Sequence, residues 1–156
     1  MASNSVERVR EALLATGHGD TIQAFPEGTR SAADAARAVG CTVAQIVKSM
    51  VFRQGDMPVL VLTSGSNRVD RAKVSALLGA PVEPADGNWV RKATGFAIGG
   101  VAPVGHSVPV RVLIDEDLTA LSPVWAAAGS PMHAFSTETA TLQAITGGRV
   151  ADVKEG

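Results

Sequence analysis

Apolar and polar residues alternate along the chain in a way that predicts short helices and short strands throughout. Apolar residues recur at helical spacing over residues 5–15. Ser31 precedes an alanine-rich segment that stops at Gly40, which predicts a second helix with a serine cap and a glycine stop. A third short helix is expected over residues 43–48, running directly into an extended segment at residues 50–52.

The clearest extended pattern is a β-hairpin in the first half of the chain. Residues 54–56, Gln-Gly-Asp, have the composition of a tight turn, and residues 58–63, Pro-Val-Leu-Val-Leu-Thr, are almost continuously apolar. A continuous apolar run is typical of a strand that is buried on both faces. Asp70 then predicts the cap of a helix that reaches Leu78.

The remaining segments are short and mixed. We expect strands at 21–25, 81–82, 110–114, 132–136 and 150–153, helices at 89–93 and 137–146, and an irregular or helical segment at 118–127. No linker, repeat or low-complexity tract divides the chain. The pattern therefore predicts one domain over residues 1–156, of α+β (mixed α/β) class, with a curved mixed β-sheet flanked by short helices.

Composition and charge narrow the range of locations and partners that we expect for the protein. The 156 residues are 46% hydrophobic and 19% charged, with no apolar run long enough to cross a bilayer and no secretory pattern at the start, so we expect a cytoplasmic protein without a membrane partner. The net charge of −1 provides no general attraction for nucleic acid, and contact with RNA would have to be local.

Several kinds of catalytic site are absent from the sequence. The single cysteine and three scattered histidines have no metal-ligand spacing, so neither a metal nor a cofactor is expected. No phosphate-binding P-loop occurs, and Ser64 lacks the Gly-x-Ser-x-Gly surroundings of a serine hydrolase nucleophile.

Lys48 is the charged residue that solvation explains least, because its neighbours over residues 46–52 are nearly all apolar. Two interpretations remain open. It can be a helix-terminal lysine that reaches water along its aliphatic stem, or a fixed ammonium in a cleft that binds a carbonyl or phosphate oxygen.

Residues 95–106 form a glycine-rich loop that ends at His106. Gly99 and Gly100 would let a ligand approach the main-chain amides, and Pro103 would stiffen the loop. The alternative is that these glycines only turn the chain between two strands.

Four further polar residues are candidates for binding a substrate. Thr63 and Ser64 follow the central strand, where ligands often lie in mixed sheets, although residues there can equally cap the next helix. Ser130 and His133 lie close together in the sequence and could line a cleft, while a lone histidine can also be purely structural.

Three motifs in register resemble the YbaK family, the free-standing relatives of the editing domain of bacterial prolyl-tRNA synthetases. They are Gln-Ile-Val-Lys-Ser-Met-Val-Phe at 45–52, Val-Leu-Val-Leu-Thr-Ser-Gly at 59–65 and Gly-Phe-Ala-Ile-Gly-Gly-Val-Ala-Pro-Val-Gly-His at 95–106. The resemblance extends from about residue 25 to residue 152.

The resemblance implies a hydrolase that removes a wrong small amino acid, such as Cys, Ala, Ser or Thr, from misacylated tRNA. It places the family's lysine at Lys48 and its Gly-x-x-x-Pro loop at Gly99 to Pro103. Lys48 would then polarise the ester for attack by water, while Val101 and Pro103 limit the size of the amino acid. The implied partners are the acceptor end of tRNA and an aminoacyl-tRNA synthetase.

Two other functions could use the same residues around Lys48 and the glycine-rich loop. One is a non-catalytic module that binds aminoacyl-tRNA or a synthetase, and the other acts on a different small aminoacyl conjugate.

Overall fold

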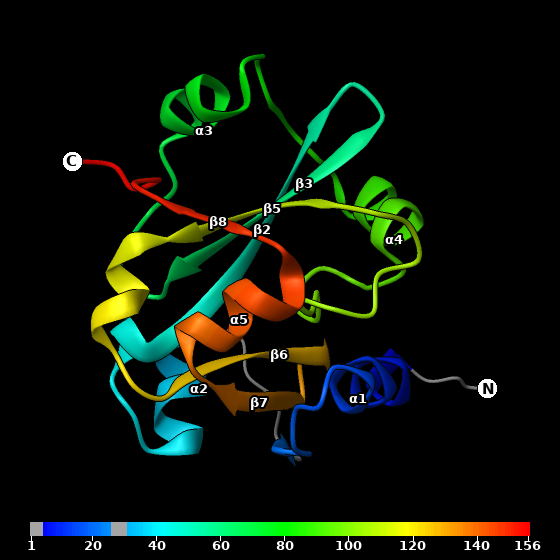
Figure 1. Cartoon of the computed structure of the whole chain (residues 1–156), viewed down its shortest axis with the longest axis vertical. Helices are drawn as coiled ribbons and strands as arrows, with labels where there is room; N and C mark the ends of the chain where they lie inside the picture. Colours follow the sequence, from blue (N-terminus) through cyan, green and yellow to red (C-terminus); the bar gives the residue numbers. More distant parts are fainter. Residues whose placement is uncertain (1–4, 26–30) are drawn as a thin grey trace.

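One mixed β-sheet runs through the molecule, with helices packed around it (Figure 1). The computed structural model describes residues 5–25 and 31–156, and within them eight strands join the sheet in the order β1-β7-β6-β2-β3-β5-β8, with β4 paired to β2. The pairs β2–β6, β3–β5 and β5–β8 are parallel and the others antiparallel. The strands are β1 (Ile22–Ala24), β2 (Ile46–Gln54), β3 (Met57–Ser64), β4 (Glu83–Pro84), β5 (Arg111–Asp115), β6 (Val124–Ser130), β7 (His133–Thr137) and β8 (Arg149–Ala151).

Short helices connect the strands, and this mixed architecture confirms the predicted fold class. Predicted caps are present: the Ser31 side chain accepts a hydrogen bond from the Asp34 amide, and Gly40 ends the same helix in the left-handed conformation. The helices are α1 (Ser5–Ala15), α2 (Ala32–Val39), α3 (Arg71–Leu78), α4 (Gly87–Thr94) and α5 (Thr139–Thr146), with 3-10 turns η1 (Val43–Gln45) and η2 (Glu116–Ala120).

Strand β3 is buried on both faces, as its continuous apolar run predicts. Val59 and Val61 pack on one side of the sheet with Val74 of α3. Leu60 and Leu62 pack on the other side, in the larger core that α1, α4 and α5 cover. All four strand residues are fully buried, so β3 holds the two halves of the core together.

Three predictions about secondary structure were wrong. The helix expected over 43–48 is only the turn η1, and the chain is already extended at Ile46. The segment expected to be irregular or helical at 118–127 ends as strand β6, because pairing with β2 overrides the helical preference of its alanines. The strand expected at 81–82 forms two residues later, as β4.

The edge of β2 that faces β6 is only partly paired. Strand β6 pairs with Ile46 and Val47, and β4 pairs with Phe52 and Arg53 on the same strand. Within the described part of the chain, no strand pairs with residues 48–51 along this edge. The sheet therefore has a gap beside the residues that include Lys48.

Shortening a core side chain of β3 should strongly destabilise the fold. Leu60→Ala removes a fully buried side chain from the centre of the sheet and should lower the free energy of unfolding by about 2–5 kcal/mol. Chemical denaturation measures this change. Met57→Ala, on the same strand but with its side chain 43% exposed, is the control and should change stability by less than about 0.5 kcal/mol.

Candidate functional site

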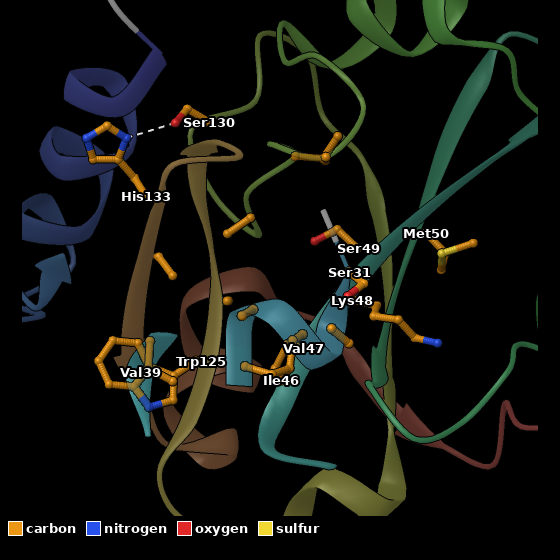
Figure 2. A pocket seen from close by; sticks show the side chains of 17 residues that line it. Ser31, Val39, Ile46, Val47, Lys48, Ser49, Met50, Trp125, Ser130 and His133 are labelled. Carbon is orange, nitrogen blue, oxygen red and sulfur yellow. Dashed lines mark hydrogen bonds between the residues drawn. The ribbon is translucent and has the colours of Figure 1, made fainter. Parts of the chain in front are cut away.

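A cavity of about 210 Å³ occupies the gap in the sheet beside β2 (Figure 2). Helix α2 forms one wall, β6 and β7 form another, and the glycine-rich loop adds a third. Most of the lining is small and apolar. The lining residues are Ser31, Ala32, Ala35, Val39, Ile46, Val47, Lys48, Ser49, Met50, Gly99, Val101, Trp125, Ala126, Ala127, Ser130, His133 and Ala134.

Lys48 is the third residue of β2 and is one of the residues that line the cavity. Its ammonium points away from Ser130 and His133 (Figure 2) and donates a hydrogen bond to the main-chain oxygen of Asn67, 2.5 Å away. Burial lowers the pKa of Lys48, the positive charge of Arg68 lowers it further, and the Asp115 carboxylate raises it. The partly buried ammonium is thus held against the loop that carries Asn67.

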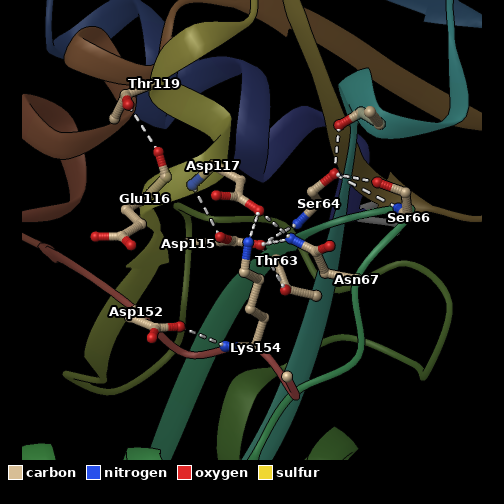
Figure 3. A network of polar contacts seen from close by, with 12 residues as sticks. Thr63, Ser64, Ser66, Asn67, Asp115, Glu116, Asp117, Thr119, Asp152 and Lys154 are labelled. Carbon is tan, nitrogen blue, oxygen red and sulfur yellow. Dashed lines mark hydrogen bonds and ion pairs between the residues drawn. The ribbon is translucent and has the colours of Figure 1, made fainter.

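A buried carboxylate organises the loop after β3, whose residue Asn67 accepts the hydrogen bond from Lys48 (Figure 3). Asp115 ends β5 with no exposed surface, and its Oδ2 accepts hydrogen bonds from the Thr63 hydroxyl, the Ser64 amide and the Asn67 side chain, at 2.8–3.0 Å. Asn67 is thereby fixed with its main-chain oxygen toward Lys48. Asp115 was not among the residues predicted from the sequence, although it is an acidic residue at the end of an apolar segment.

The outer part of this network reaches the end of the chain. The Asn67 side-chain amide also donates to Asp117, which accepts a second hydrogen bond from the Lys154 ammonium at 2.7 Å. These two donors lower the pKa of the Asp117 carboxyl. The loop that carries Asn67 is therefore tied both to the core and to the C-terminal segment.

Thr63 and Ser64 serve this network and are not among the residues that line the cavity. The Thr63 hydroxyl donates to Asp115, and the Ser64 hydroxyl donates to the Ala44 carbonyl at 2.7 Å. Both side chains are buried. We therefore assign them to the support of Lys48 and not to direct contact with a ligand.

Ser130 and His133 lie across the cavity from Lys48, at the turn between β6 and β7. The Ser130 hydroxyl lies 2.8 Å from His133 Nδ1 and accepts a hydrogen bond from the Met132 amide at 2.9 Å. Folding thus brings these two candidates together with Lys48.

The glycine-rich loop is divided between two places. Gly99 and Val101 line the cavity, and their amides make no hydrogen bond within the described residues. Gly100 packs so closely on Ser130 that a Cβ atom would lie 2.7 Å from the Ser130 Cα, and its amide donates to the Ala97 carbonyl. Gly100 is thus needed for packing, while the amides of Gly99 and Val101, at the cavity, have no partner among the described residues.

Pro103 and His106 line a different hollow, beside α1. His106 Nε2 lies 2.6 Å from the Ala102 carbonyl oxygen, and the ring meets Phe96 edge to face at 5.2 Å. Burial lowers the pKa of His106, the hydrogen bond with Ala102 raises it, and Arg8 lowers it. We therefore leave both residues out of the site around Lys48.

Arg8 of α1 holds the two ends of the glycine-rich loop together. Its guanidinium donates to the Gly105 carbonyl at 2.8 Å and to the Gly95 carbonyl at 2.9 Å, and lies 4.5 Å from the centre of the Phe96 ring. The planar guanidinium can reach two acceptors at once, which a lysine cannot do in the same way. Nothing in the sequence near Arg8 pointed to this role.

Among the described residues, no three histidine, cysteine or acidic side chains gather in a way that could hold a metal ion. In that same part of the chain, no helix has the length and apolar composition to cross a membrane.

Comparison with known proteins gives consistent matches. The profile of the aminoacyl-tRNA editing domain family matches residues 26–145. A crystal structure described as that of "a putative trans-editing enzyme for prolyl tRNA synthetase" is 46% identical, covers 100% of both chains and has a TM-score of 0.93. The uncharacterized protein YwhH of Bacillus subtilis (strain 168) is 28% identical over 127 residues, 81% of each chain. The proline–tRNA ligase of Desulfotalea psychrophila is 31% identical over 119 residues, which span 73% of this chain and 20% of the ligase.

Replacing Arg8 should loosen the glycine-rich loop without unfolding the protein. Arg8→Lys keeps the charge but loses one of the two charged hydrogen bonds, so amide hydrogen exchange over residues 95–105 should rise about 10- to 100-fold. Exchange in α5 should not change. Arg10→Lys is the matched control on α1, because within the described part of the chain Arg10 pairs with the acidic side chains Glu7 and Asp20 and with no loop carbonyl. Equal exchange in the two variants would contradict the role of Arg8.

Proposed function

Because the chain belongs to the aminoacyl-tRNA editing domain family, we propose that it hydrolyses the ester that joins a wrongly attached small amino acid to tRNA. Its relationship to the editing region of proline–tRNA ligases supports tRNA as the carrier of that ester. The observation that carries the proposal is the small, mostly apolar cavity that Lys48 and the glycine-rich loop both line.

The size of the cavity suits an amino acid with a small side chain. Pockets for larger organic ligands typically exceed about 300 Å³, whereas this cavity holds about 210 Å³. Val39, Ile46 and Val101 restrict it with branched side chains, and the alanines of α2 and β6 leave the remaining space. Large amino acids would not fit without movement of these walls.

Lys48 is the residue we propose to act on the ester. A lysine ammonium has three N–H groups, and one of them already donates to Asn67, so two remain for substrate oxygens. A positive charge held there would orient the ester and stabilise the negative charge that develops on its carbonyl oxygen. The free amides of Gly99 and Val101 would hold the aminoacyl group on the opposite wall.

Water is the nucleophile in this proposal. Its oxygen attacks the ester carbonyl carbon, the bond from that carbon to the ribose oxygen breaks, and the ribose oxygen leaves with a proton. An aminoacyl ester is already reactive, so positioning and charge stabilisation supply most of the acceleration and no protein base is required. Ser130 and His133 would contact the bound amino acid.

The direct test is release of amino acid from a panel of charged tRNAs by the purified protein. We expect release from at least one tRNA that carries a small, wrong amino acid. Absence of release from every tRNA, at nearly stoichiometric protein, would contradict hydrolysis and favour a module that only binds.

In the same assay, Lys48→Met and Lys48→Ala should slow release about 10²- to 10³-fold, because each removes a charge that stabilises the transition state. The methionine keeps the apolar stem in the cavity wall, which separates loss of the ammonium from loss of packing. Lys92→Ala, on an exposed position of α4, is the control and should keep the wild-type rate. Wild-type rates for both Lys48 variants would overturn the assignment.

The lowered pKa of Lys48 makes a separate prediction. Because burial and Arg68 favour the neutral amine, Lys48 should lose its proton at a lower pH than an ordinary lysine. Activity that needs the ammonium should therefore fall as the pH rises through this lowered pKa. Following the Lys48 Cε resonance by NMR as the pH is raised measures the pKa of Lys48, with the exposed Lys92 as the comparison. A Lys48 pKa at or above that of Lys92 would contradict the prediction.

A further inference from the structure

The main chain of β2 has unpaired hydrogen-bonding groups at the edge beside the cavity. In an antiparallel pair, every second residue directs both its amide and its carbonyl to the partner strand, and the residues between direct both groups the other way. The Gly65 amide donates to the Ile46 carbonyl at 2.6 Å, so the even-numbered residues of β2 turn these groups toward β3. The odd-numbered residues from Val47 to Arg53 therefore turn them to the opposite edge.

Neighbouring strands occupy both ends of this edge but not its middle. Strand β6 pairs with Val47, and β4 pairs with Arg53. Ser49 lies between them, and neither its amide nor its carbonyl has a hydrogen-bond partner among the described residues. Ser49 is also one of the residues that line the cavity (Figure 2). The cavity edge of β2 thus offers one main-chain donor and one main-chain acceptor on the same residue.

The gap has the length of a single residue of an added strand. In a sheet, two opposite residues of an antiparallel pair exchange both of their main-chain hydrogen bonds. A ligand that replaces the missing residue must therefore carry a donor and a carbonyl oxygen separated by one carbon atom. An α-aminoacyl group has this arrangement, because its amino nitrogen and its acyl carbonyl flank the α-carbon in the same way as the main-chain groups of one residue.

An amino group in this cavity needs a hydrogen-bond acceptor, and the described lining provides few. It contains no carboxylate. Ser130 and His133 are already hydrogen-bonded to each other. The Ser49 carbonyl, which has no partner among the described residues, is the acceptor that remains on β2, next to the residue whose ammonium we propose to act on the ester.

We propose that the aminoacyl group binds as one added residue at the edge of β2, with its α-amino group donating to the Ser49 carbonyl and its ester carbonyl oxygen accepting from the Ser49 amide. This inference rests on the proposed hydrolysis of aminoacyl-tRNA. It assigns the groups that all amino acids share to the main chain of Ser49. Acyl esters without an α-amino group lose one of the two contacts and bind more weakly.

The first test compares Ser49→Pro with Ser49→Ala in the release of amino acid from charged tRNA. Both variants lose the side-chain hydroxyl, but only proline also removes the main-chain N–H. A proline is tolerated in a strand where its missing N–H would face away from the neighbouring strand, as it does here. Release should be about 10- to 100-fold slower in Ser49→Pro than in Ser49→Ala, because a donor to the ester oxygen is lost. Equal rates in the two variants, with thermal unfolding curves showing both folded, would overturn the inference.

The second test uses the unaltered protein, so it holds even if the proline variant does not fold. The probe is 3′-(L-alanylamino)-3′-deoxyadenosine, whose amide bond replaces the ester, and the matched control is the 3′-propionylamino compound, which lacks the amino group. Hydrogen exchange of the Ser49 amide, measured by NMR, should slow about 10-fold or more when the alanyl compound saturates the protein. The Met50 amide, which faces β3, should not change. The propionyl compound should bind about 10-fold more weakly.

The outcomes separate this inference from the proposed function. Unchanged exchange of the Ser49 amide with the alanyl compound bound, or equal affinity for the two compounds, overturns the inference and leaves the hydrolase intact. A protein that releases amino acid from charged tRNA but does not bind the alanyl compound also overturns the inference, since this compound carries both groups assigned to Ser49. Failure to release any amino acid from any charged tRNA overturns the proposed function itself.

Discussion

Burial of β3 on both faces fixes the register of everything around the cavity. Its side chains enter two separate cores, so a shift of β3 by one residue would exchange its two apolar faces and disrupt both. That register places Lys48 opposite Thr63 on the neighbouring strand and brings β5, with Asp115 at its end, alongside. The position of the ammonium is therefore a consequence of core packing two residues or more away from it.

The parts of the fold that were predictable from sequence are those with local causes. Helix caps such as Ser31 and Asp70 and the uninterrupted apolar run of β3 depend on neighbouring residues, and these elements formed as expected. Strand β6 was missed because its alanines favour a helix and only pairing with β2 makes it extended.

The site followed the same division between local and long-range causes. Lys48 was identifiable because a lysine is unusual among so many apolar neighbours. Asp115 and Arg8 were not, since their importance lies in contacts with residues far away in the chain. The polar groups around Lys48 also have different tasks. Asp115 accepts hydrogen bonds from the Thr63 hydroxyl and the Ser64 amide, and the Ser64 hydroxyl donates to a main-chain carbonyl. The amides of Gly99 and Val101, in contrast, have no partner among the described residues.

The two hydrogen bonds from Arg8 to the glycine-rich loop join residues separated by 87 and 97 positions. Contacts of such separation cost chain entropy to close, and a fold rich in them folds more slowly than one built from local contacts. During synthesis α1 leaves the ribosome long before the loop exists, and the local contacts of the loop, such as Gly100 with Ala97 and His106 with Ala102, do not join its two ends. The cavity is therefore completed only when the beginning of the chain meets its second half, so an incomplete or partly folded chain would hold Lys48 without a finished pocket.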